Sequence, residues 1–214
     1  MKKQKDFFGV WTDSEEKKKK GSGVGLLINN KWEKHLSQVK RISVYYIEAL
    51  FIFKRQKMLI IAIYIPHNDK ETRREIQHQV IRRCNECTRK GTKIIVLGDF
   101  NDIRNKELDQ NRKESRRTSK LPLLAWFESS RMIDSFRHLH PNVKKFSRLN
   151  SIVNSRIDYI WLSRELEQGL VYCNIIEVDT ITDSDHSIVV ATISTGIMNK
   201  PRSLACNKKL KGKQ

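Results

Sequence analysis

Apolar residues along the chain gather in short runs between polar stretches, a pattern typical of a domain with many strands and few helices. Residues 42–53 and 58–66 are rich in β-branched and aromatic side chains, and a short polar segment separates them, so we expect a β-hairpin. The other expected strands lie at 24–28, 93–97, 156–162, 171–178 and 186–193. A second helix is expected after a polar loop at 103–120.

Between residues 68 and 90 the apolar period changes from that of a strand to that of a helix. Asn68 begins a sequence that resembles a capping box, and Gly91 stands where a helix commonly ends. A strand, a helix and a strand in succession form a crossover that lays the two strands parallel. Tyr64 and Asp99 are therefore expected at the same edge of one sheet.

The charge of the chain favours nucleic acid as its partner. The 214 residues carry 42 Lys and Arg against 24 Asp and Glu, a formal net charge of +18. Residues 1–20 contribute +3 and residues 200–214 contribute +6, so the body between them is itself basic at +9. We expect a solvated basic segment over 1–20, one domain over 21–195 and a solvated basic tail over 196–214.

Composition also argues against several classes of protein. No apolar run approaches the ~18 residues that a membrane-spanning helix needs, so no membrane partner is expected. The first residues are basic but lack the apolar segment of a secretory signal. Four cysteines in a chain of this length do not make a disulfide scaffold. We therefore expect an intracellular protein that is not secreted, with the nucleus as one location.

Three short motifs each place an acidic residue at or just beyond the end of an apolar run. They are Gly98-Asp99-Phe100-Asn101, Arg156-Ile157-Asp158-Tyr159 and Ser184-Asp185-His186. Each motif alone is common in turns or on surfaces. Their occurrence in this order in one chain, downstream of Tyr64, favours a shared site.

With these motifs the sequence resembles the endonuclease/exonuclease/phosphatase superfamily, which has the DNase I-like fold. Within it, the sequence is most similar to the apurinic/apyrimidinic endonuclease-like domains of non-LTR retrotransposons. The resemblance runs from about Gly21 to about Ile193 and implies an α/β protein, a four-layer α/β sandwich with mixed sheets. It also implies an endonuclease that hydrolyses phosphodiesters in DNA with a divalent metal, Mg²⁺ or alternatively Mn²⁺.

The resemblance implies a catalytic role for residues of all three motifs. Asp99 would position or deprotonate the attacking water, and Asn101 would hydrogen-bond in the same cluster. His186 would contact the scissile phosphate, and Asp158 would orient that histidine.

The resemblance further places Asp185 close to the metal and assigns Tyr64 a hydrogen bond to the phosphate. The chemistry agrees, because in-line attack on a phosphodiester needs an activated water and a cation that faces the developing charge. Oxygen ligands suit Mg²⁺, which keeps several waters and needs only one or two protein carboxylates.

The sequence departs from the family at its start. Relatives begin with two strands, which bear a metal-site asparagine and a metal-binding glutamate, upstream of the segment that Gly21 matches. Glu15 and Glu16 lie in a charged run without a preceding apolar strand, so neither is assigned as that ligand. We therefore expect a truncated domain that lacks the first strands.

Substrate contacts are expected from the basic loop at 103–120, although a solvated loop is the alternative. Its candidates for the DNA backbone are Arg104, Arg112, Arg116 and Arg117. Phe146-Ser147-Arg148 stands where relatives often have Phe-Thr-Trp, which is a second departure and concerns a local substrate contact.

Two further functions stay open at this point. The first is a catalytically impaired remnant that holds nucleic acid without cutting it, which the missing upstream asparagine and glutamate favour. The second is a phosphatase of the same fold that acts on small phosphate esters.

Overall fold

The structure is a computed structural model that describes residues 2–4, 6–12, 23–54, 56–111, 122–177 and 184–198. Their strands form three sheets, and we call the six-stranded sheet, of order β4-β5-β6-β7-β9-β8, the main sheet. Its strands are β4 (Leu36–Ser43), β5 (Tyr46–Phe53), β6 (Gln56–Tyr64), β7 (Lys93–Asp99), β8 (Ile133–Asp134) and β9 (Asp158–Leu162). The smaller sheets comprise β1 (Lys2–Gln4), β2 (Phe7–Trp11) and β3 (Gly25–Asn29), and β10 (Leu170–Ile176) with β11 (Ile188–Ile193). The helices are α1 (Lys70–Arg89), α2 (Pro122–Ser129) and α3 (Ser135–Leu139), with 3₁₀ turns η1 (Asn30–His35), η2 (Arg164–Gly169) and η3 (Thr195–Met198).

The centre of the main sheet is the predicted crossover. β5 and β6 form the expected antiparallel hairpin, and β6 and β7 pair in parallel with α1 between them in the chain. Tyr64 is the register partner of Asp99, which confirms the prediction that they share one edge. Gly91, with a φ of 61°, follows the C-terminal end of α1 as expected.

Two local predictions in this region are wrong. The apolar run 42–53 is not one strand, because β4 ends at Ser43, whose hydroxyl accepts a hydrogen bond from the Tyr45 N–H in the turn before β5. The cap of α1 is Asp69 and not Asn68, since the Asp69 carboxylate accepts from the Thr72 N–H at 2.9 Å. A capping side chain must reach the amides of the first turn, and Asp69 is the residue placed to do so.

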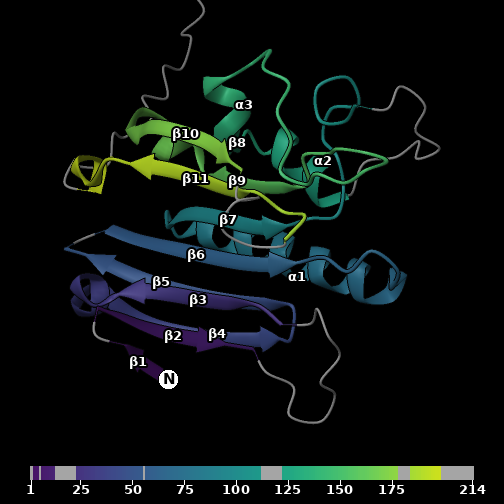
Figure 1. Ribbon diagram of the computed structural model, residues 1–214. Helices are drawn as coiled ribbons and strands as arrows, with labels where there is room; N and C mark the ends of the chain where they lie inside the picture. The colour runs from purple at the N-terminus through teal and green to yellow at the C-terminus, as the bar shows by residue number, and fades with distance from the viewer. Residues whose placement is uncertain are drawn as a thin grey trace, which may run out of the picture.

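The two faces of the main sheet bury different partners (Figure 1). On one face Leu59, Ile61 and Ile63 of β6 pack with the apolar side of α1 and with α2. On the other face β5 contributes Ala49 and Phe51 to a second core that also contains β2, β3, η2 and η3. Because a strand sends alternate side chains to opposite faces, a sheet covered on both sides reads as the nearly continuous apolar runs seen in the sequence.

The prediction that residues 1–20 form a solvated segment is wrong for Phe7–Trp11. This segment is strand β2, which pairs antiparallel with β3, and Phe8 and Val10 are each only 1% exposed in the second core. The lysines around it raise the mean polarity, but alternate apolar positions suffice to bury one face of a strand. Residues 13–22 lie outside the described part of the chain. At the other end, Ile197 and Met198 are buried in the same core, so the predicted tail does not begin at 196.

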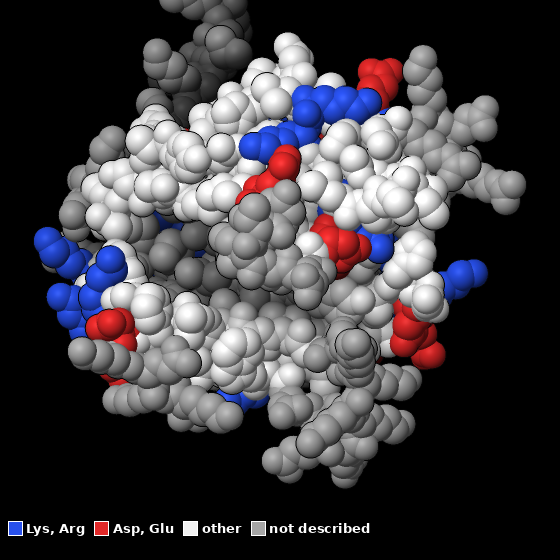
Figure 2. Space-filling view, in the orientation of Figure 1, with Lys and Arg blue, Asp and Glu red and all other residues white. Residues whose placement is uncertain are grey.

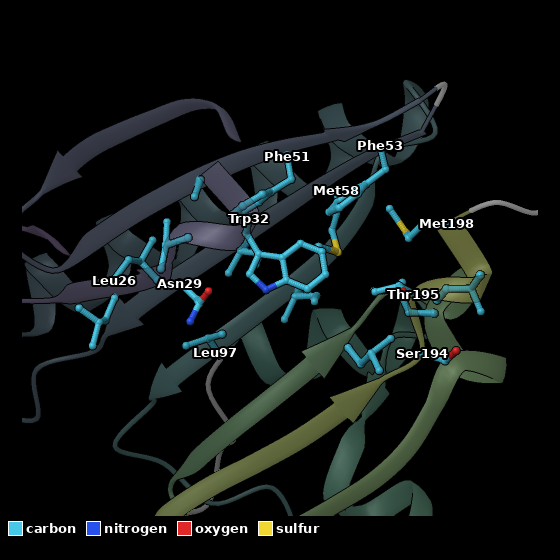
Figure 3. Close-up of a pocket in the computed structure, with 18 of the residues that line it drawn as sticks. Leu26, Asn29, Trp32, Phe51, Phe53, Met58, Leu97, Ser194, Thr195 and Met198 are labelled. Atoms are coloured by element: carbon cyan, nitrogen blue, oxygen red, sulfur yellow. The ribbon is translucent and has the colours of Figure 1, made fainter. Parts of the chain in front are cut away.

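An apolar pocket of about 620 Å³ lies between β3 and the end of β11 (Figure 3). Leu26 of β3 and Ile193 of β11 contribute to its walls, and Phe51, Met58 and Leu97 contribute from the main sheet. Among the described residues, no helix is both long and apolar enough to cross a membrane.

The backbone conformation and the close packing of β7 require a glycine at position 98. Its φ is 138°, and a Cβ atom there would stand 1.8 Å from the carbonyl oxygen of Ile63 on the neighbouring strand. We expect Gly98→Ala to lower the free energy of unfolding by about 3 kcal/mol or more, because both the conformation and the close approach exclude a side chain. Urea denaturation followed by circular dichroism measures the loss. Gly196→Ala is the matched control, since its Cβ would meet only the Ser194 hydroxyl at 3.4 Å, and equal losses in the two variants would contradict the prediction.

Candidate active site

Three neighbouring strands of the main sheet bring polar side chains to one edge. Tyr64 ends β6, Asp99 ends β7 and Asp158 begins β9, and Asp99 is the register partner of both other residues. His186 joins them from the segment before β11, which forms a bridge with Arg148. The sequence motifs therefore converge as predicted, although they are far apart along the chain.

Asp158 and His186 form a hydrogen-bonded pair. The Nδ1 atom of the His186 ring lies 3.0 Å from Oδ2 of Asp158. This bond raises the pKa of His186 above its usual value, with burial opposing the change. The pairing fixes the orientation of the ring and directs its other nitrogen, Nε2, away from Asp158.

Ser147 supports this pair, a role that the sequence did not predict. Its fully buried hydroxyl donates to Oδ2 of Asp158 at 2.7 Å and accepts from the backbone N–H groups of Ile157 and Asp158 at 3.1 and 3.0 Å. A single serine 11 positions upstream gives no signal of such contacts, because they depend on tertiary packing.

Asp99 is held by the residue two positions later. The backbone N–H of Asn101 donates to one carboxylate oxygen at 2.8 Å, and the Asn101 side-chain amide donates to the other at 3.2 Å and to the Ile65 carbonyl at 3.0 Å. Burial, and then repulsion from Asp158, raise the pKa of Asp99 to about 6. A carboxylate that titrates close to neutral pH is suited to accept a proton from water.

Tyr64 remains a proton donor at this edge. Burial, followed by the negative charge of Asp99, raises the pKa of its phenol above the usual value. The neutral hydroxyl can therefore donate a hydrogen bond to an anionic group at physiological pH.

The residues present fit a divalent cation. Asp99, Asp158 and His186 each offer one donor atom, and these atoms lie within 4.8 Å of one another. Asp185, the predicted metal residue, lies beside this cluster, with Oδ1 3.9 Å from Nε2 of His186. Its Oδ2 accepts a hydrogen bond from Nε of Arg148 at 2.8 Å, which holds the pKa of Asp185 below its usual value. Two or three carboxylates at one edge are a donor set that Mg²⁺ accepts.

Of the four arginines predicted to contact DNA, the structure describes Arg104. Arg104 donates to Glu128 at 2.9 Å and lies over the Trp161 ring, so its guanidinium takes part in an internal network. The remaining candidates, Arg112, Arg116 and Arg117, lie outside the described residues. On the face shown in Figure 2, lysine and arginine side chains stand in several separate groups interspersed with acidic ones.

Together the mixed sheet and the cluster at its edge define an α/β protein with a polar site where three neighbouring strands end or begin. The family model described as endonuclease-reverse transcriptase matches residues 58–190, and the chain belongs to this family. A comparison with curated protein sequences found no match.

Solved structures show the same fold. The catalytic domain of Xenopus laevis APE2 has a TM-score of 0.73 and 19% identity, with 89% of this chain and 76% of that chain covered. A 3′ phosphatase, NExo from Neisseria bound to a product DNA hairpin, has a TM-score of 0.69 and 16% identity, covering 88% and 80%. An AP endonuclease from Archaeoglobus fulgidus has a TM-score of 0.63 and 16% identity, covering 88% and 79%. These likenesses confirm the predicted DNase I-like α/β fold.

The raised pKa of Asp99 predicts how the free energy of unfolding depends on pH. Because the folded protein binds this proton more tightly than the unfolded chain, Asp99 contributes a destabilisation that grows as the pH rises from about 4 through about 6. We expect Asp99→Asn to raise the free energy of unfolding at pH 8 by about 1–3 kcal/mol, and this gain to vanish below pH ~4, where the carboxyl is protonated in both states. Urea denaturation at both pH values measures it.

Asp185→Asn is the control for that measurement, since the pKa of Asp185 is shifted in the opposite direction by Arg148. We expect no gain at pH 8 for this variant. A gain for Asp99→Asn that is equal at the two pH values would contradict the explanation by burial and charge.

The pair of Asp158 and His186 makes a second prediction. We expect Asp158→Asn to lower the pKa of His186, because the bond from the ring to a negative carboxylate is the main cause of its raised value. NMR titration of the imidazole reports it, with Asp6→Asn, at an exposed position on another part of the chain, as the control. A His186 pKa that is the same in both variants would show that the pair does not control the ring.

Proposed function

We propose that this protein is a divalent-metal-dependent phosphodiester hydrolase, an endonuclease of the retrotransposon type that acts on DNA. The observation that carries the proposal is the group of Asp99, Asp158 and His186, whose donor atoms lie within 4.8 Å of one another at one sheet edge. The family match supports the reaction class, and the DNA hairpin in the Neisseria structure supports the substrate class.

Each side chain then has a task that its geometry suits. Asp99, with a pKa of about 6, accepts a proton from the attacking water, and Asn101 keeps its carboxylate in place through two hydrogen bonds. His186, held through Nδ1 by Asp158, presents Nε2 to a phosphate oxygen. Tyr64 donates a hydrogen bond from its hydroxyl to the same phosphate.

Mg²⁺, or Mn²⁺ in its place, would supply a positive charge that polarises the phosphoryl oxygens. Asp158 and Asp185 would hold it, with Asp99 beside it. The carboxylates suit a hard cation that prefers oxygen ligands.

Several finer features stay predictions. They are the fourth layer of the sandwich, the absence of the family's first strands, contacts of the basic loop with DNA, and an intracellular or nuclear location. The basic body of the chain, at +9 between its two ends, supports contacts with the DNA backbone.

A nicking assay on supercoiled plasmid with Mg²⁺ tests the proposal. We expect Asp99→Ala and His186→Ala each to lower the nicking rate by about 100-fold or more, since each removes a proton-transfer or charge-stabilising group. Asp6→Ala, a substitution at an exposed aspartate, should retain the wild-type rate. Removal of the metal with EDTA should stop nicking.

Equal nicking by wild type and Asp99→Ala would overturn the proposal. Salt-sensitive DNA binding without any metal-dependent nicking would identify the impaired remnant instead. Phosphate release from small esters, with no plasmid nicking, would identify the phosphatase.

A further inference from the structure

Arg148 lies inside the candidate active site, although no step described above uses it. The main chain on both sides of it is fixed against the segment that carries Asp185. The Leu149 N–H donates to the Asp185 carbonyl at 2.7 Å, and the Ser187 N–H donates to the Ser147 carbonyl at 2.6 Å. The fold therefore fixes the backbone of Arg148 beside the segment that carries Asp185.

The guanidinium of Arg148 is held by a carboxylate but remains partly open to solvent. Its Nε donates to Oδ2 of Asp185 at 2.8 Å, and the two side chains are 39% and 47% exposed. A pair this exposed contributes little to stability, so a competing anion or cation can replace either partner. Only one of the five N–H groups of a guanidinium is needed for this bond.

The charge of Arg148 also reaches the centre of the site. It opposes the burial that raises the pKa of Asp99 and of Tyr64, so the guanidinium acts electrostatically on both. Arg148 is therefore near Tyr64, to which the proposed function assigns a hydrogen bond with the phosphate. Arginine binds phosphate oxygens in a planar, bidentate geometry that lysine does not reproduce.

We propose that Arg148 is a substrate-binding residue that contacts a phosphate of the DNA backbone, and that Asp185 holds it in position until DNA binds. On binding, the guanidinium exchanges the carboxylate for the phosphate, and the carboxylate of Asp185 becomes available to the divalent cation beside His186. The inference rests on the proposed function, because it assumes the same site and substrate class.

The exchange has a consequence that a merely structural ion pair lacks. In the absence of DNA, the guanidinium and the metal compete for Asp185. Removal of Arg148 should therefore tighten metal binding while it weakens DNA binding, so the two affinities change in opposite directions.

Two titrations of the purified full chain test this. Isothermal titration with Mn²⁺ alone should give a Kd for Arg148→Gln about 3- to 10-fold lower than for wild type, because a competing positive charge is gone. Fluorescence anisotropy with a duplex DNA oligonucleotide in EDTA should give a Kd about 5- to 10-fold higher, with a salt slope smaller by about one. Arg148→Lys keeps the charge, so its Mn²⁺ affinity should stay close to wild type while its DNA affinity falls part of the way.

Arg164→Gln is the matched control. It removes the same charge from an exposed arginine on η2 that stands 3.9 Å from Glu167. If Arg148→Gln matches this control in either titration, the proposal is overturned. Thermal melts of both variants verify that the fold is retained, and Arg148→Lys provides the test should Arg148→Gln not fold.

Neither titration requires turnover, which separates the two proposals. A wild-type protein that does not cut DNA overturns the endonuclease while both affinities remain measurable. A protein that cuts DNA, but whose Mn²⁺ and DNA affinities ignore residue 148, overturns the role of Arg148 alone.

Discussion

The pairing of β7 with β9 places Asp99 directly opposite Asp158, and the rest of the site follows from this contact between two carboxylates. Like charges opposite each other in a sheet are unfavourable, and burial adds to the cost. The protein offsets it by assigning each carboxylate its own donors. Asn101 donates to Asp99, while Ser147 and the His186 ring contact Asp158. These bonds do not remove the unfavourable free energy completely, and the remainder is seen in the raised pKa of Asp99.

A buried ionic network behind the edge keeps this arrangement in place. Arg156, 1% exposed, donates to both Asp109 and Asp134, and Arg137 donates to Asp109 at 2.7 Å. The Arg156 guanidinium also lies 4.5 Å from the centre of the Tyr159 ring. Removal of one partner from such a cluster leaves a buried charge unpaired, so the cluster favours one arrangement of the chain. The network joins Asp109, in the loop after Asn101, to Asp134 of β8 through Arg156. Arg156 lies two positions before Asp158, so the network also supports the start of β9.

The sequence predicts what local patterns determine. The crossover, and with it the meeting of Tyr64 and Asp99, follows from apolar periodicity and from the handedness of strand connections. Strand β2 was not predicted because residues 1–20 are rich in lysine on average, although Phe8 and Val10 alternate as buried apolar residues within them. Ser147 was missed for another reason: its three hydrogen bonds join segments 10 or 11 residues apart, and no spacing rule describes them.

The net charge of the chain and the charge of the site have opposite signs, and this difference bears on how the site can accept a phosphate. The body of the domain is basic, yet Asp99, Asp158 and Asp185 gather at one edge. Arg148 lies beside Asp185 and offsets part of this negative charge. A divalent cation among the carboxylates reverses the sign of the local field. The basic surface can therefore bring a nucleic acid to the protein, and a cation at this edge would add to the attraction that Arg148 exerts on one phosphate.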